Sequence, residues 1–156
     1  MIWLRTLLFT VLVPATVTVY LPWWIVSRTS PMGPERWRWL AAAPIALGAA
    51  LYVWCAVDFA LARGTPAPID PPRELVARGP YRWSRNPMYL GVASVLLGEA
   101  LWFGSRALLG LALVVVTGFH AFVTLYEEPS LRRRFGDAYE SYCRAVPRWL
   151  PRRPLP

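Results

Sequence analysis

The chain contains no lysine, a single histidine and two cysteines among its 156 residues. Two cysteines and one histidine cannot complete a typical structural zinc site, and no donors lie at metal-ligand spacing, so we expect no metal centre. Cys55 falls in an apolar stretch and Cys143 in a polar segment. Because they lie on different elements in an expected reducing compartment, we predict no disulfide.

Long stretches also lack charge. Residues 7–26, 39–57 and 107–126 contain no Asp, Glu, Lys or Arg. At about 1.5 Å of rise per residue, a helix of each stretch reaches across a hydrocarbon core of roughly 30 Å. Hydrophobic residues make up 56% of the chain, more than a soluble domain of this size hides from water. Membrane insertion is therefore expected.

We predict one all-α integral membrane domain over residues 1–156. Its four transmembrane helices are expected at about residues 3–26, 38–61, 87–104 and 107–127, and a cytosolic loop at 63–86. The third stretch is shorter and is expected to span because a tight turn joins it to the fourth. Gly91, Ser94 and Gly98 place small residues along it, which indicates close helix packing.

A further helix is predicted at residues 129–146, which would lie on the membrane surface and cover a site. Its apolar residues recur at steps of three or four on one face, namely Leu131, Phe135, Tyr139, Tyr142 and Val146. Pro129 is expected to begin this helix, because a proline biases the residue before it away from helix and suits a first helical position.

The distribution of the 17 basic residues, all arginine, predicts the orientation. If both termini lie on one side, 13 arginines lie there and four on the other. The positive-inside rule then places both termini and the long loop in the cytosol, and we expect a multi-pass protein of a bacterial inner (plasma) membrane. The arginines stand at the ends of apolar runs and form no continuous basic face, so no nucleic-acid partner is expected.

Two polar motifs interrupt this pattern. Residues 78–91 read RGPYRWSRNPMYLG, and residues 126–151 read YEEPSLRRRFGDAYESYCRAVPRWLP. Together they resemble the signature of the integral-membrane methyltransferases that include isoprenylcysteine carboxyl methyltransferase and the phospholipid methyltransferases. The resemblance covers residues 72–151. It implies S-adenosylmethionine as cofactor, a cytosolic cofactor pocket and a lipophilic, membrane-embedded methyl acceptor.

The resemblance also implies site residues. Those expected to bind the cofactor are Arg73, Glu74, Leu75, Val76, Tyr81, Asn86, Pro87, Met88, Tyr89 and Glu127. Glu127 would meet the ammonium group of the cofactor through a charge-assisted hydrogen bond. The catalytic candidates are Arg85, Asn86 and Glu128. Consecutive helical residues point about 100° apart, so we expect Glu128 to pair with Arg85 or Arg132 and not with the ligand that Glu127 binds.

Two positions depart from the family pattern. Asn86 stands where the family often has histidine, which disfavours acid or base catalysis there. Val123 stands where the prenylcysteine enzymes have an arginine that meets the substrate carboxylate. The acceptor therefore stays open between a prenylcysteine-like carboxylate, a phospholipid amine and a smaller isoprenoid or fatty acid. A proton that must leave would pass to Glu128, His120 or solvent. A non-enzymatic ligand-binding or assembly protein is the alternative, and the oligomeric state is not defined by the sequence.

Overall fold

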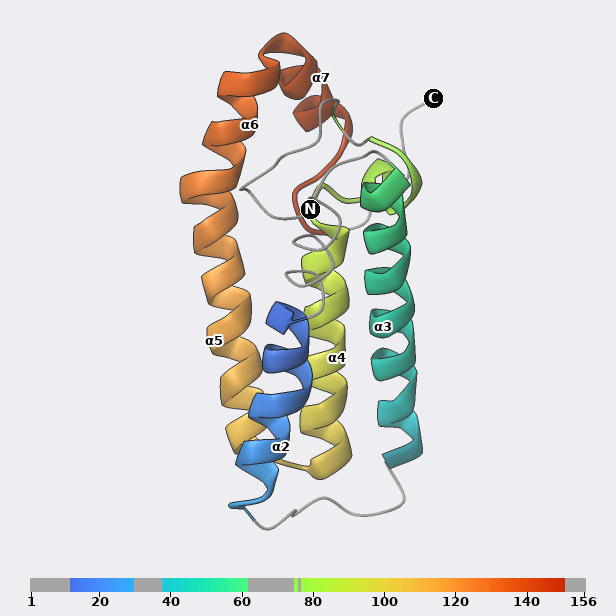
Figure 1. The fold of residues 1–156 in the computed structure, drawn as a ribbon, viewed down its shortest axis with the longest axis vertical. Helices are drawn as coiled ribbons and strands as arrows, with labels where there is room; N and C mark the ends of the chain where they lie inside the picture. The colour runs from blue at the N-terminus through green and yellow to red at the C-terminus, as the bar shows by residue number, and fades with distance from the viewer. Residues whose placement is uncertain (1–11, 30–37, 62–74, 76, 151–156) are drawn as a thin grey trace.

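The computed structural model describes residues 12–29, 38–61, 75 and 77–150, and over these residues it contains helices and no strand (Figure 1). A π-helical turn, η1 (Thr16–Tyr20), and α2 (Leu21–Val26) belong to one apolar helix, Leu12–Val26. The other elements are α3 (Arg38–Leu61), η3 (Gly79–Arg82), α4 (Pro87–Phe103), α5 (Arg106–Phe122), η4 (Val123–Glu127), α6 (Glu128–Phe135) and α7 (Asp137–Ala145). The predicted helical residues 3–11 lie outside the described residues.

The helices α3, α4 and α5 form the body of the molecule (Figure 1). α4 lies between α3 and α5 and packs on both, while α2 contacts α4 and α5 at the end of the bundle remote from α7. The tight turn between α4 and α5 uses Gly104, whose φ of 58° favours glycine. Ser105 then caps α5 by accepting a hydrogen bond from the amide of Leu108 at 3.3 Å.

The predicted small-residue packing is confirmed, and its partner is α3. A Cβ added to Gly91 would lie 2.8 Å from the carbonyl oxygen of Gly48, and one on Gly98 would lie 2.5 Å from Cγ1 of Ile45. Between them, the Ser94 hydroxyl donates a hydrogen bond to the Pro44 carbonyl at 2.9 Å. This hydrogen bond joins α4 to α3 at the place where the two helices lie close together.

The surface of the bundle indicates a membrane environment. The helices over Arg38–Phe59 and Arg106–Phe135 are long and apolar enough to span, whereas Leu12–Val26 and Pro87–Phe103 are apolar but shorter. Large apolar side chains point outward, for example Leu47 at 70% and Leu113 at 68% exposure. Large apolar side chains exposed on helices of this length favour lipid contact.

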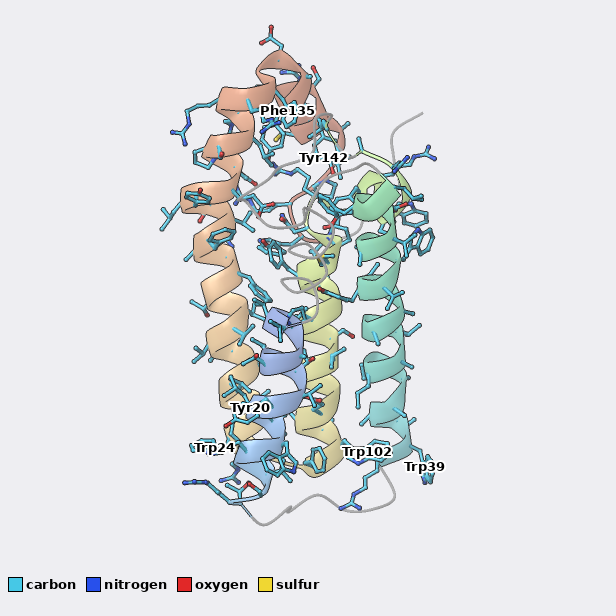
Figure 2. The ribbon with its side chains drawn as sticks, in the orientation of Figure 1. Tyr20, Trp24, Trp39, Trp102, Phe135 and Tyr142 are labelled. Carbon is cyan, nitrogen blue, oxygen red and sulfur yellow. The ribbon has the colours of Figure 1, made fainter. Side chains whose placement is uncertain are left out.

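Aromatic side chains mark the two ends of the bundle. Figure 2 shows Tyr20, Trp24, Trp39 and Trp102 at the end away from α7, and Phe135 and Tyr142 at the other end. The rings of Trp39 and Trp102 meet edge to face with centroids 6.2 Å apart. Tryptophan and tyrosine gather at membrane–water interfaces because each combines an apolar ring with a polar N–H or O–H group. Aromatic residues at both ends of the bundle and exposed apolar side chains between them are both expected of a membrane-spanning protein.

The prediction of one continuous helix over residues 129–146 was wrong, because these residues are divided between α6 and α7. The helix that begins at Arg106 continues through Pro129 to Phe135, so α6 extends α5 and does not start a separate element (Figure 1). Gly136, with φ of 50°, then ends α6, and α7 turns back over the bundle. The predicted apolar face is therefore divided between two helices.

A π-helical turn explains how the chain passes Pro129. A proline in an α-helix removes one hydrogen bond and its ring meets the carbonyl four residues earlier. Here η4 stands immediately before, and the amide of Glu128 bonds to the carbonyl of Val123, five residues back. The same relation recurs at η1 and Pro22. In both helices a wider turn precedes the proline and the helix continues.

Candidate functional site

The first motif forms a short loop that lies on the end of α3. Gly79 has φ of 55°, and a Cβ there would overlap the carboxylate of Asp58 and lie 3.2 Å from the indole nitrogen of Trp54. Arg78 donates to the main-chain carbonyl of Asp58 at 3.0 Å. The backbone of this loop therefore approaches α3 where only glycine fits, and it leads through η3 into the buried Pro87 at the start of α4.

Tyr81 is buried within this loop. Its ring meets Phe59 of α3 edge to face at 5.4 Å, and its carbonyl accepts a hydrogen bond from the Tyr142 hydroxyl at 2.7 Å. Burial, followed by the neighbouring Cys55 thiol, raises the pKa of Tyr81 well above its usual range. Tyr81 thus stays a neutral phenol that connects α3, the loop and α7 and does not act as a base.

Tyr89 and Glu127 meet between α4 and the end of η4. The Tyr89 hydroxyl donates to Oε2 of Glu127 at 3.0 Å, and the Tyr89 ring packs on Phe119 at 4.6 Å. Glu127 is half-buried, and within the described part of the chain no cation lies at ion-pair distance from it. A carboxylate whose described partner is a neutral phenol can accept a hydrogen bond from a cationic ligand.

Glu128, the next residue, is in the opposite situation. It is 3% exposed, and its two oxygens accept bonds from Arg148 at 2.7 and 2.9 Å. Arg85 adds a contact of 3.0 Å and Arg132 one of 4.0 Å. The predicted divergence of the two glutamates is confirmed, as is the pairing of Glu128 with Arg85 and Arg132. Its main partner, Arg148, was not predicted.

Arg148 also holds the start of α4 through its main chain. Its carbonyl accepts from the Asn86 side-chain amide at 3.0 Å and from the Ser84 hydroxyl at 3.2 Å. The neighbouring Pro147 carbonyl accepts from the Arg85 amide at 2.9 Å. The hydrogen bond to Glu128 raises the pKa of the Arg148 guanidinium. The segment after α7 therefore fixes both motifs against each other.

A second contact fastens the same segment to α5. The indole N–H of Trp149 donates to Nδ1 of His120 at 3.2 Å, with ring centroids 6.0 Å apart. An imidazole that accepts at Nδ1 is neutral and carries its proton on Nε2. On the other side, Arg85 donates to the sulfur of Cys143 at 2.8 Å. Cys55 and Cys143 are both free thiols.

Sequence reasoning missed Arg148 although it lies in the second motif. A proline at 147 ends α7, because proline cannot continue a helix, and this is the one local signal that the chain turns there. The direction of the turn depends on the Glu128 carboxylate, which lies 20 residues earlier. No periodicity links the two positions.

The predicted cofactor residues fall into three groups. Tyr89 and Glu127 are in contact, and Asn86, Pro87 and Tyr81 lie buried in the loop and the first turn of α4. Leu75 and Met88 are half-buried. Arg73, Glu74 and Val76 lie outside the described residues.

Residues 37–138 match the model of the phospholipid methyltransferase family, a span that holds the loop, α4 and both glutamates. The chain belongs to this family. It is 39% identical over 64 residues to a protein of Haemophilus influenzae described as uncharacterized, an alignment that covers 40% of this chain and all of that protein. No solved structure matches the chain. From its family and its long apolar helices, the protein is a membrane-associated methyltransferase.

Proposed function

We propose that the protein transfers the methyl group of S-adenosylmethionine to a lipophilic acceptor that lies in the membrane. The observation that carries this proposal is the contrast between two adjacent carboxylates. Arginines surround Glu128, while Glu127 has the Tyr89 phenol as its described partner. S-adenosylmethionine carries an ammonium and a sulfonium group, and a half-buried carboxylate whose described partner is a neutral phenol suits such a cation.

In this proposal each residue at the site binds or positions. Glu127 accepts a hydrogen bond from the cofactor's ammonium group, and the Tyr89 hydroxyl holds that carboxylate in place. The buried Asn86 and Pro87 fix the first turn of α4, from which Met88 and Tyr89 project. Arg73, Glu74, Leu75 and Val76 remain proposed contacts. The cofactor supplies a methyl group that is already activated, so the protein has chiefly to orient the acceptor and exclude water.

We infer that Arg85, Asn86 and Glu128 have positioning roles rather than acid–base roles. Both oxygens of Glu128 are bound by arginine, which stabilises its charged form, and the Asn86 amide is bound to a carbonyl. His120 accepts from Trp149 at Nδ1, so its Nε2 already carries a proton. We infer that a proton released by an amine acceptor passes to solvent.

Among the acceptors, we favour a phospholipid amine over a prenylcysteine carboxylate. The family description names phospholipid methyltransferases. Val123 occupies the position at which the prenylcysteine enzymes have arginine, and it is 1% exposed. A carboxylate acceptor would then lack its cation, which is costly inside a protein. An amine needs no such partner.

We further propose four membrane spans with the loop at 63–86 and both termini in the cytosol of a bacterium. Thirteen arginines on that side against four on the other support this orientation. Reporter fusions test it. A fluorescent protein fused after residue 156 should fold in the cytosol, and alkaline phosphatase inserted between residues 30 and 37 should be active. The reverse pattern would contradict the orientation.

Calorimetric titration of S-adenosylmethionine into the detergent-purified protein tests the methyl-donor site. We expect saturable binding that Glu127→Ala weakens and that Glu140→Ala, at a 45% exposed side chain of α7, leaves unchanged. No binding to folded protein, in detergent and in lipid nanodiscs, would favour the non-enzymatic alternative. Transfer of labelled methyl groups to phosphatidylethanolamine, compared with a farnesylcysteine analogue, then distinguishes the acceptors.

A further inference from the structure

A groove of about 490 Å³ opens between α3 and α4 at the end of the bundle that carries η3. Its walls are mainly apolar, with Leu51 and Trp54 from α3, Trp83 from the loop and Leu90 from α4. Arg82 is the charged residue among those that line it. Small-molecule sites commonly have this size and composition, with an apolar wall and a few placed polar groups.

The groove is separate from the Tyr89–Glu127 pair. On α4 it is lined by Pro87 and Leu90, which lie about 60° apart around the helix at 100° per residue. Tyr89 lies about 200° from Pro87 on the same count, and it contacts Phe119 and Glu127 on the α5 side. The groove therefore faces away from the site proposed for methyl transfer.

The depth of the groove corresponds to the boundary between headgroups and hydrocarbon. Leu51 lies ten residues before the end of α3, about 15 Å along the axis, whereas Arg82 lies on the loop above. Trp54 is 58% and Trp83 51% exposed. Tryptophans favour the headgroup level, where an apolar ring and a polar N–H are both solvated. The apolar floor thus lies deeper than the cation.

We propose that this groove binds one anionic phospholipid, with an acyl chain along Leu51 and Leu90 and the phosphate at Arg82. Charge favours this occupant, because the groove offers a cation and an apolar channel, and the chain has a net charge of +8. Basic pockets between helices on the cytoplasmic side bind anionic headgroups. The lipid would rest on Gly79 and Ser84, and Ser84 donates to the Arg148 carbonyl. Occupancy would therefore hold the first motif against α3.

Native mass spectrometry of the full chain, titrated with phosphatidylglycerol or phosphatidylcholine from neutral detergent, tests this site. We expect the first phosphatidylglycerol molecule to bind with about fivefold higher affinity than the first phosphatidylcholine molecule. Arg82→Gln should remove that preference. Arg133→Gln, which removes an equal charge from the exposed side of α6, should keep it.

A second pair of variants tests the apolar channel. Leu51→Trp should fill the groove and lower the affinity for both lipids, while Leu47→Trp, one turn earlier at a 70% exposed position, should not. Circular dichroism establishes that each variant is folded. Equal affinity for the two lipids in the wild-type protein, or equal effects within either pair of folded variants, would overturn the proposal. The outcome is independent of cofactor binding at Glu127.

Discussion

The guanidinium of Arg148 binds both carboxylate oxygens of Glu128, at 2.7 and 2.9 Å, across 20 residues of sequence. Glu128 begins α6, and Arg148 lies on the segment that follows α7. The same arginine offers its carbonyl to Asn86 and Ser84. One residue thus connects the two sequence motifs, and the geometry of the site depends on it.

Arg148→Ala should lower the free energy of unfolding by about 1.5–3 kcal/mol, because it removes a two-fold hydrogen bond to a buried charge. Arg85 remains beside Glu128 and limits the loss. Thermal unfolding in detergent measures the effect. Arg132→Ala is the matched control, since that exposed side chain lies 4.0 Å from Glu128 and exposed pairs contribute about 0–1 kcal/mol. Equal effects of the two substitutions would contradict the assignment.

The Tyr89–Glu127 hydrogen bond leads to a double-mutant prediction. Glu127→Ala should weaken S-adenosylmethionine binding by about 1.5–3 kcal/mol, and Tyr89→Phe, which keeps the ring on Phe119, by about 0.5–1.5 kcal/mol. If Tyr89 acts by holding the carboxylate, it loses its effect once Glu127 is absent. Calorimetric measurement of the S-adenosylmethionine affinity of both single variants and the double variant tests this role. Strictly additive losses would show that the phenol contacts the ligand independently.

The close contact of α3 and α4 predicts unequal tolerance of alanine. Gly91→Ala should destabilise the fold by about 1–3 kcal/mol, because its Cβ would lie 2.8 Å from the Gly48 carbonyl. Gly110→Ala on α5 meets nothing within 4 Å and should be neutral or stabilising. The stabilities of the two variants are compared by their unfolding midpoints in detergent. A Gly91→Ala protein as stable as Gly110→Ala would mean that the helices are further apart in the membrane.

The sequence was sufficient for features that depend on local pattern. The apolar run from residue 38 to 61 forms α3 over the same residues, and the small residues of α4 lie against it. The angular separation of Glu127 and Glu128 also follows from helix geometry, and the structure gives them different partners.

Features that depend on long-range contacts could not be predicted from the sequence. Pro129 reads as a helix start in any local rule, but the π-turn before it and the ion pairs of Glu128 keep the helix continuous. Arg148 reads as one arginine among 17. Its role appears only when α7 folds back over the loop.

The single histidine allows a test of the segment after α7. Trp149 donates to Nδ1 of His120, which requires the tautomer with its proton on Nε2. In ¹⁵N-labelled protein at neutral to alkaline pH, we expect His120 to show that tautomer, with Nδ1 as the unprotonated nitrogen. Trp149→Phe keeps an aromatic ring but has no donor, so the signals should move toward a mixture of both tautomers.

Trp39→Phe, at the opposite end of the bundle (Figure 2), is the control and should leave the His120 signals unchanged. Because the chain has one histidine, the signals need no assignment. A mixed tautomer in the wild-type protein, or identical spectra for wild type and Trp149→Phe, would show that the segment does not dock on α5. Arg148 would then lack its neighbouring anchor, and the unfolding loss for Arg148→Ala should fall toward that of the Arg132 control.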